Sequence, residues 1–252
     1  MIRPTTRLFF LIFSFFVLAG CSVHQPAESD NVNSDSSNVY SYRAPSSDGS
    51  GKIYMGREIA GVMDPDNASW LERPNRIVEE MPEQVLRHMN LKPDEVVADI
   101  GAGTGYFTFR LSHILPGGKI LAVEIQPEML EIIKKRVRKM QVKNVFPILG
   151  TLTDPNLPDA GVDVVLMVDA YHEFSYPREM MEAIVRSLKP DGRVVVIEYR
   201  GEDPRVTKPP HHKMTEPQLI KEMAAVGLRW QETKDFLPQQ HFMVFERSIN
   251  RR

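Results

Sequence analysis

A glycine-rich segment between two regular elements most strongly constrains how this chain can fold. Residues 95–110 read EVVADIGAGTGYFTFR, a short run rich in β-branched residues, then three glycines, then residues that suit a helix. This pattern predicts a strand, a tight turn and a helix. The glycines let the backbone turn sharply and approach a ligand, and the helix offers its N-terminal N–H groups. The segment therefore predicts an α/β domain with a ligand at this turn.

The spacing of the glycines distinguishes this turn from that of the dinucleotide-binding folds. Their third glycine comes three residues after the second, where this chain has Tyr106. With Asp99 the segment becomes DIGAGTG, which resembles the first motif of class I S-adenosylmethionine-dependent methyltransferases. The resemblance implies that Asp99 engages the ammonium group of the cofactor S-adenosylmethionine. It also implies that the glycine loop packs against the amino-acid part of that cofactor through Gly101, Gly103 and Gly105.

Two further acids follow the next two strands. The strand KILAVEI ends with Glu124, about twenty residues beyond the glycines, where a carboxylate can accept both ribose hydroxyls. After the strand NVFPIL, the resemblance implies that Asp154 meets the adenine, although the family usually has its acid directly after the glycine, where Thr151 stands here. A role as a cap or turn residue ahead of Pro155 explains Asp154 equally well.

The candidate catalytic residues follow the fourth strand. VDVVLMVDA is almost continuously apolar, as expected of a central parallel strand, and it delivers Asp169, His172 and Glu173 to the edge where such sheets bind ligands. An imidazole suits the removal of a proton from a methyl acceptor, so His172 is the candidate base and Glu173 its orienting partner. Packing of the strand end is the alternative. One histidine beside one acid is not a metal ligand set, so no metal is expected.

The later segments complete a predicted fold of the same family. Helices over 178–188 and 216–226 alternate with strands RVVVIEY, LRWQETKDF and HFMVFER. The resemblance implies a doubly wound α/β fold of the Rossmann-like methyltransferase type, with a seven-stranded, mostly parallel sheet in the order 3-2-1-4-5-7-6. We expect residues 51–252 to form this domain. Within it, residues 51–90 are expected as a helical lid, with a helix over 70–80, and residues 91–248 as the core.

The N-terminal residues predict export. Arg3 and Arg7 precede the apolar run LFFLIFSFFVLAG, the layout of a signal peptide over residues 1–20, and the run is too short to span a bilayer. Residues 18–21, LAGC, resemble the bacterial lipobox, which implies that Cys21 takes a diacylglycerol and anchors the chain to a membrane. The polar residues 21–50 are expected as a disordered tether. By resemblance to lipoproteins of Gram-negative bacteria, Ser22 after this cysteine favours the periplasmic face of an outer membrane.

Charge and composition narrow the range of possible functions. The chain has 42% hydrophobic residues and a net charge of -2, which offers no electrostatic footprint for DNA. We therefore expect a methyltransferase that acts on a small-molecule acceptor. Since S-adenosylmethionine is made in the cytosol, two alternatives stand: an exported binding or interaction protein that keeps the fold without catalysis, and a cytoplasmic product that starts at Met55.

Overall fold

The computed structural model describes residues 39–248. The expected signal peptide, Cys21 and the expected tether as far as residue 38 lie outside the described residues. None of the helices in the described part has the length and apolar character that crossing a bilayer requires.

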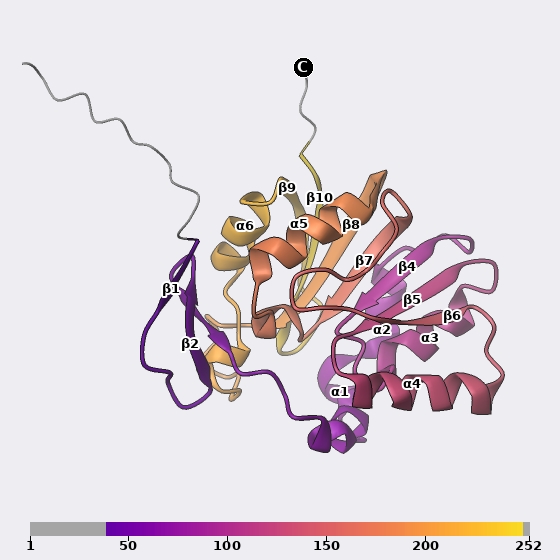
Figure 1. The fold of residues 1–252 in the computed structure, drawn as a ribbon, viewed down its shortest axis with the longest axis horizontal. Coiled ribbons are helices and arrows are strands. Elements are labelled where there is room, and N and C mark those ends of the chain that lie inside the picture. Colours follow the sequence, from indigo (N-terminus) through magenta and orange to yellow (C-terminus); the bar gives the residue numbers. More distant parts are fainter. Residues whose placement is uncertain (1–38, 249–252) are drawn as a thin grey trace, which may run out of the picture. The chain divides into compact units, whose positions relative to one another are not determined.

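A seven-stranded sheet forms the centre of the described part (Figure 1). Its order, β6-β5-β4-β7-β8-β10-β9, is the predicted order 3-2-1-4-5-7-6, which is thereby confirmed. The first five of these strands run parallel, and β10 lies antiparallel between β8 and β9. The strands are β4 (Val96–Ile100), β5 (Lys119–Glu124), β6 (Val145–Leu149), β7 (Val162–Val168), β8 (Leu188–Tyr199), β9 (Leu228–Lys234) and β10 (Gln240–Arg247).

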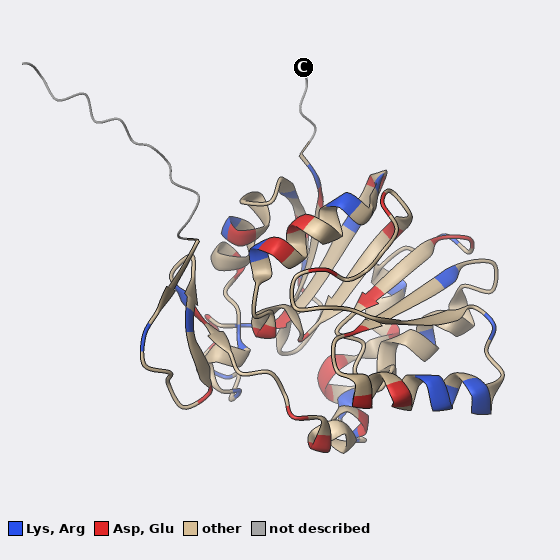
Figure 2. Ribbon diagram, viewed as in Figure 1, with Lys and Arg blue, Asp and Glu red and all other residues tan. Residues whose placement is uncertain are grey.

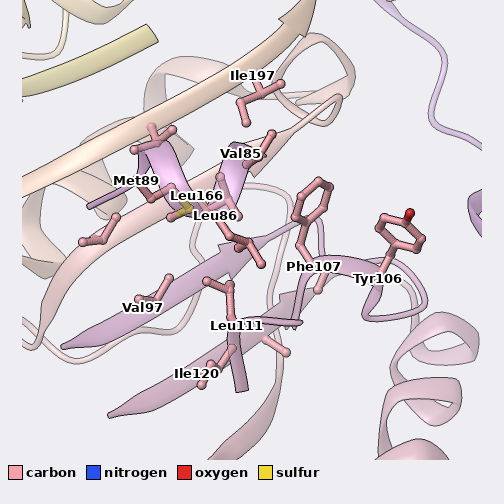
Figure 3. Packing of buried hydrophobic residues seen from close by; sticks show 14 of the residues in the cluster. Val85, Leu86, Met89, Val97, Tyr106, Phe107, Leu111, Ile120, Leu166 and Ile197 are labelled. Atoms are coloured by element: carbon pink, nitrogen blue, oxygen red, sulfur yellow. The ribbon is translucent and has the colours of Figure 1, made fainter. Parts of the chain in front are cut away.

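The core lies on both faces of this sheet, because alternate residues of a strand point to opposite sides. On β4, Val97 belongs to one hydrophobic cluster and Ala98 to the other. Figure 3 shows the first cluster, which α2 and α3 cover, whereas α5 and α6 cover the second. These helices are α2 (Pro82–His88), α3 (Tyr106–Ile114), α5 (Pro177–Ser187) and α6 (Glu216–Ala224), and α4 (Pro127–Met140) lies beside α3.

The charges along α4 match the polarity of the helix. Glu128 lies in its first turn, and Arg138 and Lys139 lie in its last turn (Figure 2). Acids near the N-terminus and bases near the C-terminus complement the helix dipole. The placement stabilises α4 with its N-terminus directly after β5, at the edge where the strands end.

The first described residues form a three-stranded antiparallel sheet, not the tether and helix expected there. β1 and the start of β2 lie in the expected tether, and β3 lies in the expected helical lid. A two-residue turn at Met55 and Gly56 joins β2 to β3. Both residues have a positive φ, 47° and 100°, which is typical of the turn in a tight β-hairpin. The segment comprises β1 (Tyr40–Tyr42), β2 (Gly49–Tyr54), β3 (Arg57–Ala60), η1 (Pro65–Glu72) and α1 (Arg76–Glu80).

The helix expected over residues 70–80 is interrupted in its middle. η1 ends at Glu72 and α1 begins at Arg76, with Pro74 between them. A proline disfavours helical backbone at the preceding residue, and Arg73 is extended there, with ψ of 138°. The interruption lets η1 and α1 take different directions beside the sheet edge.

A buried ion pair ties the small sheet to the core. Arg57 on β3 donates to both carboxylate oxygens of Glu222 on α6, at 2.7 and 3.0 Å. Glu222 is fully buried and also accepts a hydrogen bond from the Tyr171 hydroxyl at 2.7 Å. Arg57 in turn donates to the backbone oxygen of His172 at 3.2 Å. This pair therefore holds the short helix η2 (Tyr171–Glu173) in place.

We predict that Arg57→Met lowers the free energy of unfolding by about 3–5 kcal/mol, because it leaves the Glu222 carboxylate buried and unpaired. The double variant Arg57→Met/Glu222→Gln removes the stranded charge and is expected to recover much of the loss. Urea denaturation measures both. Lys134→Met, which breaks an exposed pair with Glu131, is the control and should change stability by under about 1 kcal/mol. Equal losses in the Arg57 and Lys134 variants would contradict the role of the pair.

Candidate functional site

A cavity of about 630 Å³ opens at the C-terminal ends of the parallel strands. Open α/β sheets bind their ligands at this edge, since loops and helix N-termini converge there. η1 and the residues just before it contribute a wall from the N-terminal segment, and the loops after β4, β5, β6, β7 and β8 contribute most of the rest. Its wall includes Val62, Met63, Trp70, Leu71, Arg76, Asp99, Gly101, Gly103, Tyr106, Glu124, Gln126, Met129, Thr151, Leu152, Asp169, His172, Glu173, Phe174, Tyr199, Lys208 and His212.

The glycine loop borders the cavity, and its glycines lie where neighbouring atoms leave no room for a side chain. Gly101 and Gly103 line the cavity with φ of 71° and 55°, in the left-handed region that favours glycine. A Cβ on Gly101 would lie 2.7 Å from Ala170, and one on Gly103 would lie 2.6 Å from Leu71. Gly105, expected at the cofactor, is not part of the cavity wall. A Cβ there would lie 2.6 Å from the Phe109 ring, so Gly105 serves the packing of α3.

Asp99 is buried near the end of β4 and lines the cavity. Its Oδ2 accepts a hydrogen bond from the Thr108 hydroxyl at 2.5 Å. Burial raises the pKa of Asp99 to about 6, although the Thr108 hydrogen bond and the charge of Arg76 act in the opposite direction. The carboxylate therefore has few partners within the protein that compensate its charge.

Glu124, at the end of β5, is held by the backbone around it. Its Oε2 accepts from the N–H of Gly103 at 2.9 Å, and its Oε1 accepts from the N–H groups of Ile125 and Gln126 at 2.7 and 3.0 Å. Burial raises the pKa of Glu124, and the three N–H groups offset part of this effect. The carboxylate is thus fixed in position and faces the cavity with acceptor capacity remaining.

Asp154 lies outside the cavity wall, contrary to the adenine contact expected for it. Its Oδ1 accepts from the N–H of Asn156 at 2.8 Å, which is the turn-stabilising contact typical of an aspartate. Thr151 and Leu152 of the same loop line the cavity in its place. The backbone N–H of Thr151 donates to the backbone oxygen of Asp154 at 2.8 Å. This contact closes the loop so that the Asp154 carboxylate stays outside the cavity.

His172 is buried in η2 and is oriented by Glu198, not by the expected Glu173. Its Nδ1 lies 2.6 Å from Glu198 Oε2, and its backbone N–H donates to Glu198 Oε1 at 3.2 Å. Burial acts to lower the pKa of His172, but the adjacent Glu198 carboxylate outweighs it and raises that pKa. Glu173 Oε1 lies 3.8 Å from His172 Nε2, and its Oε2 accepts from the N–H of Met63 at 3.1 Å.

Asp169 and Tyr106 bring further polar atoms to the cavity. Asp169 follows β7 with φ of 48°, and its Oδ2 accepts from Gln240 at 2.7 Å. Among the described residues, Asp169 Oδ1 and the Tyr106 hydroxyl are buried without a hydrogen-bond partner. Burial raises the pKa of Asp169 well above its usual value. Such atoms are suited to a ligand that completes their hydrogen bonds.

Sequence comparison places the chain in a family. Residues 91–240 match the family model described as "Methyltransferase domain". The chain belongs to this methyltransferase family. The chain is 32% identical to the demethylmenaquinone methyltransferase of Symbiobacterium thermophilum over 118 residues, which are 46% of this chain and 47% of that protein. It is 27% identical to the uncharacterized methyltransferase YcgJ of Bacillus subtilis, over 55% of each chain. It thus spans about half the length of these two curated relatives.

A solved structure agrees with this assignment over most of the methyltransferase. The crystal structure of a SAM-dependent methyltransferase from Aquifex aeolicus superposes with a TM-score of 0.69 at 27% identity, covering 73% of this chain and 98% of that one. The fold is therefore the Rossmann-like methyltransferase fold, and S-adenosylmethionine is the cofactor that family and neighbour imply.

The residues at the glycine-loop end of the cavity fit this cofactor. The ligand carries a cationic ammonium group and two ribose hydroxyls, and the buried carboxylates of Asp99 and Glu124 are acceptors for groups of this kind. Gly101 and Gly103 line the cavity without side chains, so the backbone there is open to close approach by a ligand. The match of donors and acceptors supports a cofactor site on these four residues.

Proposed function

We propose that this protein transfers a methyl group from S-adenosylmethionine to a small-molecule acceptor. The observation that carries the proposal is that one cavity joins two unlike ends. Asp99, Gly101, Gly103 and Glu124 form one end, and the cluster around His172 forms the other. A volume of about 630 Å³ is within the usual range for sites that enclose a small ligand.

The cofactor end would hold its ligand through charge and hydrogen bonds. In this proposal Asp99 faces the ammonium group and Glu124 accepts the ribose hydroxyls, while Gly101 and Gly103 allow close approach of the backbone. When bound, the cofactor supplies an electrophilic methyl group on a sulfonium. Transfer then requires chiefly that the acceptor atom be held in line with that methyl group.

The other end would activate the acceptor. The Glu198 carboxylate can only accept a hydrogen bond when ionised, so His172 Nδ1 donates and Nε2 carries the lone pair. A hydroxyl that takes the place of His212 Nδ1, which lies 3.1 Å from Nε2, would release its proton to that nitrogen, and Glu198 would stabilise the imidazolium that forms. His172 thus acts on the acceptor, Glu198 positions it, and Glu173 lies beside it.

The wall of the cavity favours an acceptor that is mainly apolar. Trp70, Leu71, Met129 and Phe174 all line it. Two relatives carry the names demethylmenaquinone methyltransferase and ubiquinone/menaquinone biosynthesis C-methyltransferase, which supports an acceptor with a flat apolar ring and an ionisable hydroxyl. Trp70 would contact such a ring with the part of its indole that Arg73, at 3.7 Å, and Lys208, at 4.8 Å, leave free.

We further propose that the chain is exported and anchored by a diacylglycerol on Cys21, at the periplasmic face of an outer membrane. The leader and LAGC motif of residues 1–21 support this proposal. A product that starts at Met55 would lack β1 and β2, including the buried Tyr54, which argues for the longer chain. Export favours a second candidate function, an anchored binding protein without catalysis, since the methyl donor is made in the cytosol.

We predict that Glu124→Gln weakens S-adenosylmethionine binding by about 10–100-fold, because charge-assisted hydrogen bonds to the ribose are lost. Isothermal titration of the full chain with S-adenosylmethionine and S-adenosylhomocysteine measures the change. Glu128→Gln, an exposed acid four residues along the chain, is the matched control and should bind like the parent. A folded parent chain that binds neither compound would overturn the proposal and favour the non-catalytic function.

We also predict that the affinity for S-adenosylmethionine rises by about tenfold between about pH 5 and pH 7. Asp99 has a pKa of about 6, so its carboxyl is protonated at the lower pH and cannot pair with the ammonium group. Glu124, with its raised pKa, acts in the same direction. Titrations across this range measure the profile, and Asp99→Asn should flatten it while lowering the affinity at pH 7. A profile of unchanged steepness in that variant would assign the effect to another group.

Asp99→Asn is expected to lower the affinity for the cofactor at pH 7 but not the free energy of unfolding. A carboxyl whose pKa rises from 3.8 to about 6 on folding stabilises the native state below about pH 4, and this contribution of about 3 kcal/mol is lost as the pH rises through about 6. The variant, which carries no charge, should therefore unfold at pH 7 with a free energy no lower than that of the parent. A clear loss of stability would show that Asp99 is structural.

The anchor is tested by the mass of the mature protein. In a Gram-negative host, we expect the chain to begin at Cys21 and to carry the added mass of lipid, and Cys21→Ser to abolish that addition. Intact-protein mass spectrometry of the membrane fraction measures both. A mature protein that keeps residues 1–20 or starts at Met55 would refute the export proposal and leave the proposed methyl transfer standing.

A further inference from the structure

Two histidines and one acid meet at the acceptor end of the cavity. His172 Nε2 lies 3.1 Å from His212 Nδ1, and Glu173 Oε1 lies 3.8 Å from each of these nitrogens. All three ligand atoms lie within 4.8 Å of one another, and all three residues line the cavity. His172 and Glu173 come from η2, while His212 comes from the distant short helix η3 (Pro210–His212).

We propose that His172, Glu173 and His212 form a binding site for a divalent transition-metal ion of the zinc type. Two imidazoles and one carboxylate, with coordination positions left open, are a ligand set that suits zinc and neighbouring first-row metals. The sequence-based expectation of no metal considered His172 and Glu173 alone, because His212 lies 40 residues further along the chain.

The separations of the ligand atoms fit one ion. Metal–ligand bonds of about 2.0–2.1 Å in a tetrahedral arrangement place ligand atoms about 3.4 Å apart. The observed separations are 3.1 and 3.8 Å, so shifts of a few tenths of an ångström complete the geometry. His212 is about 29% exposed and belongs to a loop segment. It can therefore make this adjustment at low cost.

The partners behind the ligands are those of a metal site. A metal-binding histidine usually donates its other ring N–H to a carboxylate, which fixes the lone pair toward the metal. His172 Nδ1 meets the buried Glu198 carboxylate at 2.6 Å. Glu173 is held in the same way, since its second oxygen accepts from the N–H of Met63 at 3.1 Å. The buried Glu198 carboxylate adds negative charge that favours a cation here.

An ion at this site would change the proposed role of His172 from that of a base to that of a metal ligand. The lone pair of Nε2 would bind the ion, and an acceptor oxygen at an open position would lose its proton because the ion lowers its pKa. The proton would pass to solvent or to Asp169, which lines the same cavity. This role rests on the proposed methyl transfer, whereas the metal site itself stands on the geometry of the three side chains.

The test is a titration of the full chain with Zn²⁺, followed by calorimetry, and with Co²⁺, followed by visible absorption. A Cys21→Ser background removes the one thiol of the chain. We expect one ion per chain and a cobalt spectrum of nitrogen and oxygen ligation. His212→Ala should weaken Zn²⁺ binding at least about a hundredfold, and Glu198→Gln about 10–100-fold. His211→Ala, which removes the adjacent histidine of the same loop, should bind as the parent does.

The His212 variant is decisive, because it leaves the buried pair of His172 and Glu198 intact and is therefore expected to fold. Thermal unfolding confirms that each variant is native before titration. Absence of Zn²⁺ binding in the folded parent would overturn the proposal, as would affinity that His212→Ala leaves unchanged. In either case the S-adenosylmethionine titration is unaffected, so the failure of the metal site and the failure of the methyltransferase proposal are told apart.

Discussion

The structure depends on how it accommodates four carboxylates at one edge of the sheet. Asp99, Glu124, Asp169 and Glu198 lie at the ends of four neighbouring strands, β4, β5, β7 and β8. Because these strands are parallel, their carboxyl ends meet at the same edge, and so do the charges. Buried charge is costly unless it is paired or hydrogen-bonded. The loops around the edge supply hydrogen-bond donors that offset that cost, and their arrangement defines the cavity.

The four acids are compensated to different degrees. Backbone N–H groups surround Glu124, and His172 pairs with Glu198, so both are well supplied with partners inside the protein. Asp99 has the Thr108 hydroxyl and Asp169 has the Gln240 amide, and burial raises the pKa of each. Asp99, Asp169 and Glu124, whose pKa burial also raises, all line the cavity, where a cationic ligand would offset their charge. The implied cofactor, with its ammonium and sulfonium charges, is such a ligand.

The sequence predicts those features that depend on residues close together along the chain. The apolar run ending at Val168 identified a central strand, and the distance from Gly105 to Glu124 placed an acid at the neighbouring strand end. These signals are local, whereas the sheet order came from the family resemblance that the motifs carry. Asp154 shows the limit of a motif: once the usual acid position holds Thr151, only the backbone path of the loop decides which side chain enters the cavity.

The features that were missed depend on contacts between distant segments. Glu198 meets His172 across 26 residues, and His212 meets it across 40. Glu198 does carry a signal, since it is a carboxylate in the otherwise apolar strand VVVIEY, and a buried strand tolerates one only with a partner. β1 and the start of β2 were missed because they lie among polar residues, which favour a prediction of disorder. β3 has only four residues, too few to show a periodicity that opposes the expected helical lid.

The N-terminal segment gives this methyltransferase domain its individual character. The family model begins at residue 91, yet Met63, Trp70 and Leu71 lie before it and line the cavity. Arg57 also lies before residue 91. Through its contacts with Glu222 and the backbone oxygen of His172, it connects the small sheet to η2. The shared core thus supplies both the glycine loop and the cluster around His172, whereas the segment before residue 91 adds a wall over the glycine loop, where Leu71 lies against Gly103. A family resemblance therefore predicts the residues of the shared core well and the rest of the cavity wall poorly, because Met63, Trp70 and Leu71 lie outside the family model.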